Sequence, residues 1–361
     1  MGGEKAASIA GAEAQGGAPA GAPVVDNNFN LLRLVFALMV AAYHLSLLPR
    51  VDAWKPAGPI MSLLAEIGVQ GFFVLSGYLV YASLRRSRSL KLYAEKRVRR
   101  LYPAYATVVL ACAVIGLAAS PAAQHDLGAV ARYLGVNLAF LNFLAPGLPG
   151  VFQNNPLTEI NGALWTLKIE VLFYVLLPVL ALLVRGKGWT RWAVLGAIYV
   201  GAEAWRYGFH QAAFHDAAFD DVAHQLPGQM SFFAVGIGFC MLDLNVRHLR
   251  YAGAIGAGLL LLSVVFPLAA PLRALGLGAV AIYVATGLPR IFDAARFGDL
   301  SYGLYIVHFP VIQVVVAVGL FAMPWAGAVI AMAGAFIAAL LLWHLVEKPA
   351  LRADSAYRKH T

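Results

Sequence analysis

Apolar runs of about 20 residues recur along most of the chain, and they restrict the fold more than any other feature. A helix of that length crosses the hydrocarbon core of a bilayer and satisfies its own backbone hydrogen bonds there. Of the 361 residues, 61% are hydrophobic and only 12% are charged, a balance that excludes an ordinary soluble globular protein. We therefore predict an all-α, polytopic membrane protein.

Ten spans are predicted, and residues 127–143 are not counted because a crossing there would invert the charge pattern downstream. All the basic loops then fall on one side, which the positive-inside rule assigns to the cytoplasm. Both termini are expected there, and residues 127–143 are interpreted as interfacial or re-entrant. The predicted spans cover approximately residues 28–49, 60–84, 103–120, 163–184, 192–205, 228–244, 251–267, 272–288, 300 onward and 325–345.

Two tails flank this region. Residues 1–26 are mainly Ala, Gly and Pro without the apolar core of a signal peptide, so a disordered cytoplasmic tail is predicted. Residues 27–350 form the predicted transmembrane domain, and residues 351–361 a basic cytoplasmic tail. In a membrane protein the net charge of +9 reports cytoplasmic loops on anionic lipid, so membrane lipids are expected partners and nucleic acid is not.

Two ionisable side chains, Arg33 and His44, interrupt the first apolar run. Eleven positions at about 100° each bring them onto one helix face, about 16 Å apart along the axis. Ionisable groups inside a spanning helix normally face the bundle interior or a wet cavity, which makes this face a candidate functional site. The same pattern would arise if Arg33 reached back to the cytoplasmic interface and His44 ended the helix, so this helix alone leaves both interpretations open.

The densest positive charge lies in residues 85–103, with eight Lys or Arg residues and one acidic residue, Glu95. Such a segment is typical of a topology signal on anionic lipid. Arg97 and Arg100, however, are three positions apart on one helix face, a spacing suited to gripping a phosphate. The sequence Leu101-Tyr102-Pro103 then predicts the end of this helix.

A polar stretch at residues 206–227 suggests a metal site. Its spacings match no compact zinc signature, so a solvated outer loop is the favoured interpretation. We predict neither a metal nor a permanently bound cofactor. The residues concerned are His210, His215, Asp216, Asp220, Asp221 and His224.

Several motifs together resemble membrane acyltransferase family 3, the O-acyltransferases of bacterial surface glycans. The first is Arg33 and His44 with ten residues between them, and residues 68–79, GVQGFFVLSGYL, are similar to the family's second-span signature. The further matching motifs are Tyr93, Lys96, Arg97, Arg100, Leu101 and Pro103; Trp165, Leu167, Glu170, Phe173, Tyr174 and Pro178; Ser301, Tyr302, Tyr305 and His308; and Glu347-Lys348-Pro349. The resemblance covers about residues 27–350 and departs from the family's pattern at Lys168, Val171 and Leu172.

The resemblance implies acyl transfer in the bacterial inner membrane. The donor would be cytoplasmic acyl-CoA, usually acetyl-CoA, and the acceptor a hydroxyl of a glycan or lipid-linked sugar. Arg33, Arg97 and Arg100 would lie on the donor side, near the CoA phosphates. The catalytic residues would be His44, as a neutral base favoured by removal from water, and Glu170, as the group that orients His44 or the acceptor. Further residues expected to line the site are Trp165, Ser76, Ser301, Tyr305 and His308.

Two functions from other classes compete with this hypothesis. A proton-coupled transporter or flippase for a glycan or lipid-linked sugar could use Arg33, His44 and Glu170 as a relay. The sequence has no internal repeat of the kind that marks many such transporters. A non-catalytic scaffold would leave the intramembrane ionisable groups without a purpose. Ser301 and His308 could also simply hydrogen-bond across helices.

Overall fold

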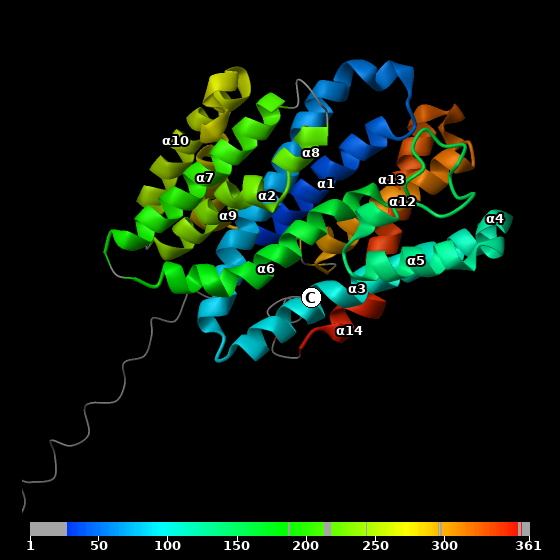
Figure 1. Cartoon of the computed structure of the whole chain (residues 1–361). Helices are drawn as coiled ribbons and strands as arrows, with labels where there is room; N and C mark the ends of the chain where they lie inside the picture. Colours follow the sequence, from blue (N-terminus) through cyan, green and yellow to red (C-terminus); the bar gives the residue numbers. More distant parts are fainter. Residues whose placement is uncertain are drawn as a thin grey trace, which may run out of the picture.

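The computed structural model describes residues 27–186, 188–212, 218–242, 244–294, 296, 298–352 and 355, and contains no strand among them (Figure 1). The predicted N-terminal tail lies outside this range, as does most of the C-terminal tail. The helices are α1 (Phe29–Leu47), α2 (Gly58–Arg86), α3 (Leu90–Ala119), α4 (Pro121–His125), α5 (Leu127–Leu138), α6 (Trp165–Leu183), α7 (Thr190–Ala212), α8 (Ala218–Ala223), α9 (Leu226–Met241), α10 (Val246–Val265), α11 (Arg273–Ile282), α12 (Leu300–Ala317), α13 (Pro324–Leu342) and α14 (Lys348–Ala350). The prediction of an all-α polytopic membrane protein is confirmed.

Eight helical segments of the described chain are long and apolar enough to cross a membrane. The sequence predicts ten, and the two that are missing from this count are present as helices. One is α9, which has only 16 residues. The other is α7, which has 23 residues but carries Arg191, Glu203 and Arg206. Both helices pack within the bundle, so ten spans remain possible. Since neither helix is both long and apolar enough by itself, the ten-span arrangement and the orientation stay predictions.

Helix α2 lies at the centre of the bundle, with α7, α9 and α10 on one side and α12 and α13 on the other (Figure 1). It packs against both α1 and α9. Gly77 and Gly236 make the second contact possible, because a Cβ atom on either would lie 2.3 Å or less from a backbone oxygen of the other helix. Small residues that let backbones approach are a general device of membrane helix packing.

Helix α1 runs parallel to α12, which explains the spacing of its two ionisable residues. Arg33 contacts Asp299, just before α12 begins, and His44 contacts His308 on α12 itself. The eleven positions from Arg33 to His44 give a helical rise of about 16 Å, and the nine positions from Asp299 to His308 give about 13 Å, so the two pairs of contacts match along the two helices. The prediction that Arg33 and His44 share one face of α1 is confirmed, and that face is directed to α12.

Helix α3 continues through Pro103, so the predicted helix end at this residue is wrong. A proline removes only one backbone donor, and membrane helices tolerate it where neighbours support the backbone. Neighbouring segments hold α3 on both sides of this point, because Arg100 forms buried ion pairs with Asp299 and Glu347 and the Tyr302 hydroxyl donates to the Leu101 carbonyl oxygen at 2.9 Å. The basic segment and the third span therefore form one helix of 30 residues.

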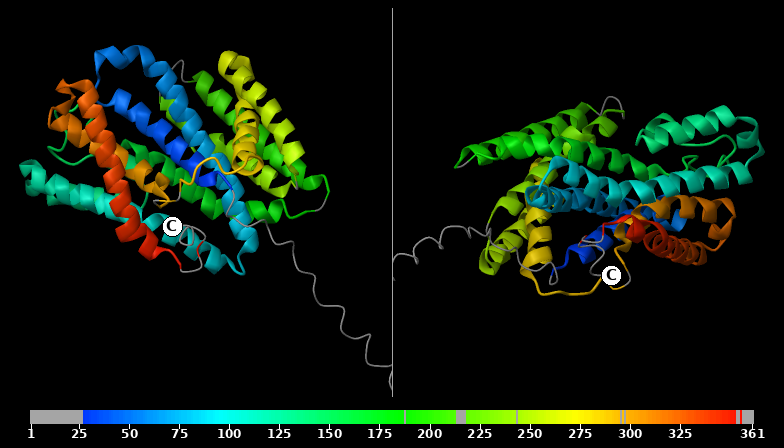
Figure 2. Two further views of the ribbon diagram at one scale, coloured as in Figure 1. Left: turned by 180° about the vertical axis from the view of Figure 1, so that it is seen from behind. Right: turned by 90° about the horizontal axis from the view of Figure 1, so that it is seen from below.

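Helices α4 and α5 extend from the side of the bundle along α3 (Figures 1 and 2). The 12 residues of α5 span about 18 Å, well short of a bilayer core of about 30 Å. This length agrees with the interpretation of residues 127–143 as a segment that does not cross.

The predicted orientation can be tested by cysteine labelling. Arg88 and Lys55 are exposed and lie beyond opposite ends of α2. In a background without Cys112 and Cys240, we expect a membrane-impermeant maleimide to label Lys55→Cys in intact cells but Arg88→Cys only after lysis. Labelling of Arg88→Cys from outside would reverse the topology and the assignment of the donor side.

Candidate active site

A buried ionic cluster joins four segments at one end of the bundle. Asp299 accepts hydrogen bonds from Arg33 at 2.7 Å and from Arg100 at 2.6 Å, and Arg100 also donates to Glu347 at 2.5 Å. Arg100, Asp299 and Glu347 are almost completely buried. Two guanidinium groups face two carboxylates, so the charges of the cluster balance.

Asp299 holds this cluster together. Burial alone would raise the pKa of its carboxyl group, but the positive charges of Arg33 and Arg100 and a hydrogen bond from Ser301 outweigh burial, so the pKa lies below its usual range. The Ser301 hydroxyl donates to Asp299 at 2.6 Å. Ser301 was predicted to line the site; in the structure it contacts Asp299 and is not among the residues that line the cleft described below. The sequence reasoning missed Asp299, although an acidic residue directly before a span that starts with a recognised motif was an available signal.

Arg97, one turn before Arg100 on α3, has different surroundings. Its guanidinium donates to the Ser83 hydroxyl at 3.3 Å and lies 5.8 Å from the ring centre of Tyr174. Its Nε atom is buried without a hydrogen-bond partner. Within the described part of the chain Arg97 forms no ion pair, so its charge is available to an anion.

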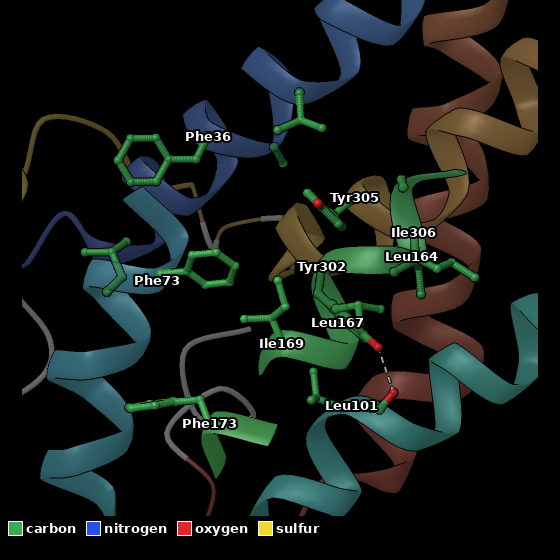
Figure 3. Close-up of a cluster of buried hydrophobic side chains, with 14 of the residues drawn as sticks. Phe36, Phe73, Leu101, Leu164, Leu167, Ile169, Phe173, Tyr302, Tyr305 and Ile306 are labelled. Atoms are coloured by element: carbon green, nitrogen blue, oxygen red, sulfur yellow. Dashed lines mark hydrogen bonds between the residues drawn. The ribbon is translucent and has the colours of Figure 1, made fainter. Parts of the chain in front are cut away.

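All three arginines line one cleft between α1, α2, α3, α6 and α12. The cavity itself has a volume of about 50 Å³, and the space in and in front of it, open solvent included, is about 710 Å³. Figure 3 shows some of its apolar walls, where Phe73, Leu101, Leu167, Tyr302 and Tyr305 converge from α2, α3, α6 and α12. The result is a largely apolar passage with cationic groups at one end, a shape suited to an anionic head and an uncharged arm.

Glu170 also lines the cleft, in contact with Ser76 and Tyr174. The Ser76 hydroxyl donates to its carboxylate at 3.1 Å, and the Tyr174 hydroxyl donates to the same oxygen. The expected contact between Glu170 and His44 is not formed among the described residues, since His44 has another partner. Through Tyr174, Glu170 instead supports the aromatic ring beneath Arg97.

The cleft is closed at its other end by a contact between α6 and α12. The hydroxyls of Thr166 and Tyr305 are 2.7 Å apart, and the ring of Phe72 packs edge-on against Tyr305. Along α12 the lining stops at Tyr305, one turn before His308. This closure separates the cleft from the histidines beyond it.

The two histidines form a pair beyond Tyr305, in which His308 is fully buried and His44 is partly exposed. His44 Nδ1 lies 2.9 Å from His308 Nε2, and His308 Nδ1 lies 3.0 Å from the carbonyl oxygen of Leu304. The ring of Phe309 packs edge-on against His44. The structure thus brings Arg33, Arg97, Arg100, Ser76, Glu170 and Tyr305 together in the cleft and sets His44 and His308 apart from it.

The remaining predicted residues lie away from the cleft. Trp165 packs edge-on against His224 on the side of α8. Of the polar stretch at 206–227, His215 and Asp216 lie outside the described residues. Within the described ranges, no group of three or more His, Cys, Asp or Glu side chains is arranged to hold a metal ion.

Comparison with known proteins relates the chain to acyltransferases. A family of acyltransferase domains matches residues 26–344. Nodulation protein 10 of Rhizobium leguminosarum bv. viciae is 27% identical over 356 residues, covering 90% of this chain and 93% of that protein. An O-acetyl transferase of Shigella phage Sf6 is 27% identical over 312 residues, covering 81% of this chain and 86% of that protein. Peptidoglycan O-acetyltransferase OatA of Listeria monocytogenes serovar 1/2a (strain ATCC BAA-679 / EGD-e) is 27% identical over 377 residues, covering 88% of this chain and 54% of that protein. No solved structure gives a significant match.

Proposed function

The chain belongs to this family of acyltransferase domains and is a multi-pass membrane O-acyltransferase, and from that premise we propose that it acetylates a surface glycan. The donor is cytoplasmic acetyl-CoA, the acceptor is a hydroxyl of a polysaccharide or lipid-linked sugar, and the protein resides in the bacterial inner membrane. The main support for the proposal is the cleft, which has the guanidinium of Arg97, without an ion-pair partner among the described residues, at one end and the histidine pair beyond the other end.

The donor end of the cleft is assigned to Arg97. Arg33 and Arg100 are already neutralised by Asp299 and Glu347, so they contribute little net attraction for an incoming anion. Arg97 has no such partner among the described residues and can bind a CoA phosphate with both of its terminal nitrogens. The uncharged arm of the donor then extends along the apolar walls toward Tyr305.

The chemical step is assigned to His44. The thioester must pass the contact between Thr166 and Tyr305 to reach it. His44 removes the proton of the acceptor hydroxyl as the oxygen attacks the thioester carbonyl carbon. The carbon–sulfur bond then breaks, the proton passes from His44 to the departing thiolate, and the products are an acetyl ester and free CoA.

Donor binding is tested first, by thermal unfolding of the detergent-purified protein. Acetyl-CoA should raise the unfolding temperature, because a ligand at about 100 times its Kd stabilises the folded state by about 2.7 kcal/mol. Arg97→Ala should show a smaller response at the same acetyl-CoA concentration and Arg99→Ala should keep the full response, since Arg99 pairs with Glu95 and does not line the cleft. Stabilisation by free sugars but by no acyl-CoA would favour a transporter.

Acceptor identity is tested in cells. Mass spectrometry of surface glycans from a deletion strain should show one acetyl group lost per modified sugar, restored by the wild-type gene but not by a His44→Ala variant. Identical glycan masses in all three strains would contradict a surface-glycan acceptor.

A further inference from the structure

We propose that His308 is a positioning residue that fixes the proton of His44 on Nδ1 and leaves Nε2 as the basic nitrogen. The inference rests on the proposed role of His44. It assigns a function to a buried histidine that does not line the cleft and that the chemical step does not use directly.

The assignment follows from the hydrogen-bond chain that ends at Leu304. A carbonyl oxygen can only accept, so His308 Nδ1 must carry a proton and donate it to Leu304 at 3.0 Å. A neutral imidazole has only one N–H group, so Nε2 of His308 is an acceptor. The contact of 2.9 Å between the two rings therefore requires His44 Nδ1 to be the donor.

Both rings are expected to be neutral at rest, because an unpaired charge in this interior would be costly. His308 is fully buried, and its two ring nitrogens are occupied by Leu304 and His44. The backbone carbonyl of α12 thus sets the tautomer of His308, and His308 sets that of His44. This is the arrangement of a base held by an orienting partner, with an imidazole in place of the usual carboxylate.

The pair also provides for the protonated state of His44. Once Nε2 has taken the hydroxyl proton, His44 carries a positive charge and its Nδ1–H bond to His308 becomes charge-assisted and stronger. The partner stabilises the base when the charge develops, without placing a permanent charge in the membrane interior. A loss of this contact should therefore lower turnover more than donor binding.

Two substitutions at His308 separate this role from simple packing. In His308→Gln the side-chain oxygen can still accept from His44 Nδ1, so we expect kcat within about tenfold of wild type. In His308→Leu the volume is largely kept but no acceptor remains, so kcat should fall by about 10²-fold or more while KM for acetyl-CoA stays nearly unchanged. Equal losses in the two variants, or no loss in His308→Leu, would overturn the proposal.

The tautomer itself can be measured without any enzymatic activity. ¹⁵N NMR of histidine-labelled protein, with the His44 signals assigned by their absence in His44→Ala, should show protonated Nδ1 and bare Nε2 in wild type and in His308→Gln. His308→Leu should shift His44 toward the Nε2–H form while still being stabilised by acetyl-CoA. Protonation of His44 on Nε2 in the wild-type protein would refute the proposal, and this result is independent of whether the enzyme acetylates a glycan.

Discussion

Replacing His44 with alanine is expected to lower acetyl transfer by about 10²–10⁴-fold, the usual contribution of a general base, while donor binding stays nearly unchanged. The base acts on the acceptor in the transition state, and His44 does not line the donor cleft. Turnover in proteoliposomes and thermal stabilisation by acetyl-CoA measure the two effects separately. His125→Ala, at an exposed histidine of α4, is the control for removing an imidazole.

Arg33→Ala provides the contrast on the same helix face. Arg33 lines the cleft and pairs with Asp299, so its loss should weaken donor binding or reduce the yield of folded protein. Near-normal turnover in His44→Ala would remove His44 from the mechanism. So would a clear loss of donor binding in His44→Ala. In either case the base would have to be sought at Glu170 or His308.

Arg97→Ala should weaken acyl-CoA binding about ten- to a hundredfold, with normal protein levels in the membrane. One lost charge-assisted contact costs about 1.5–3 kcal/mol, which corresponds to that change in affinity. Arg97→Lys should restore only part of the binding, because an ammonium group lacks the planar fork of a guanidinium. Unchanged donor affinity in Arg97→Ala would contradict this assignment and would favour the interpretation of residues 85–103 as a topology signal on anionic lipid.

Arg100→Ala should behave differently, although the sequence alone treats the two arginines as equivalent. Its removal leaves Glu347 without its ion-pair partner and Asp299 with only Arg33. Removing one partner of a buried ion pair costs about 3–5 kcal/mol. We expect a low yield of folded protein, measured by size-exclusion chromatography in detergent. Normal yield together with selective loss of donor binding would show that Arg100 contacts the donor directly.

The helices that carry the site residues, and the helix face shared by Arg33 and His44, could be predicted from the sequence. Hydropathy located most helices, and helical periodicity placed Arg33 and His44 on one face because it depends only on geometry within α1. The spacing of Arg97 and Arg100 likewise predicted that they share one helix face, and both line the cleft.

The partners across helices could not be predicted. His44 and His308 are separated by 264 positions and Arg33 and Asp299 by 266, and no local pattern links them. The sequence analysis gave Glu170 as the group that orients His44 or the acceptor, and in the structure the contact of His44 across the helices is with His308. It also could not distinguish Arg97 from Arg100, because the difference lies in two carboxylates, one from the residue just before α12 and one from the turn that follows α13.

The contact between Thr166 and Tyr305 has a consequence for the energetics of the cell. An enzyme that receives its substrates from opposite faces of an energised membrane contains the two halves of a channel, and a titratable pair between them would pass protons down the gradient. Each proton that leaks across 100 mV dissipates about 2.3 kcal/mol. Hydroxyl groups can themselves relay protons, so the barrier would come from the packing of the Tyr305 and Phe72 rings, which would keep water from forming a continuous path from the cleft to His308. If donor and acceptor reach the site from opposite faces of the membrane, as proposed, this closure would limit the loss of membrane potential through the enzyme.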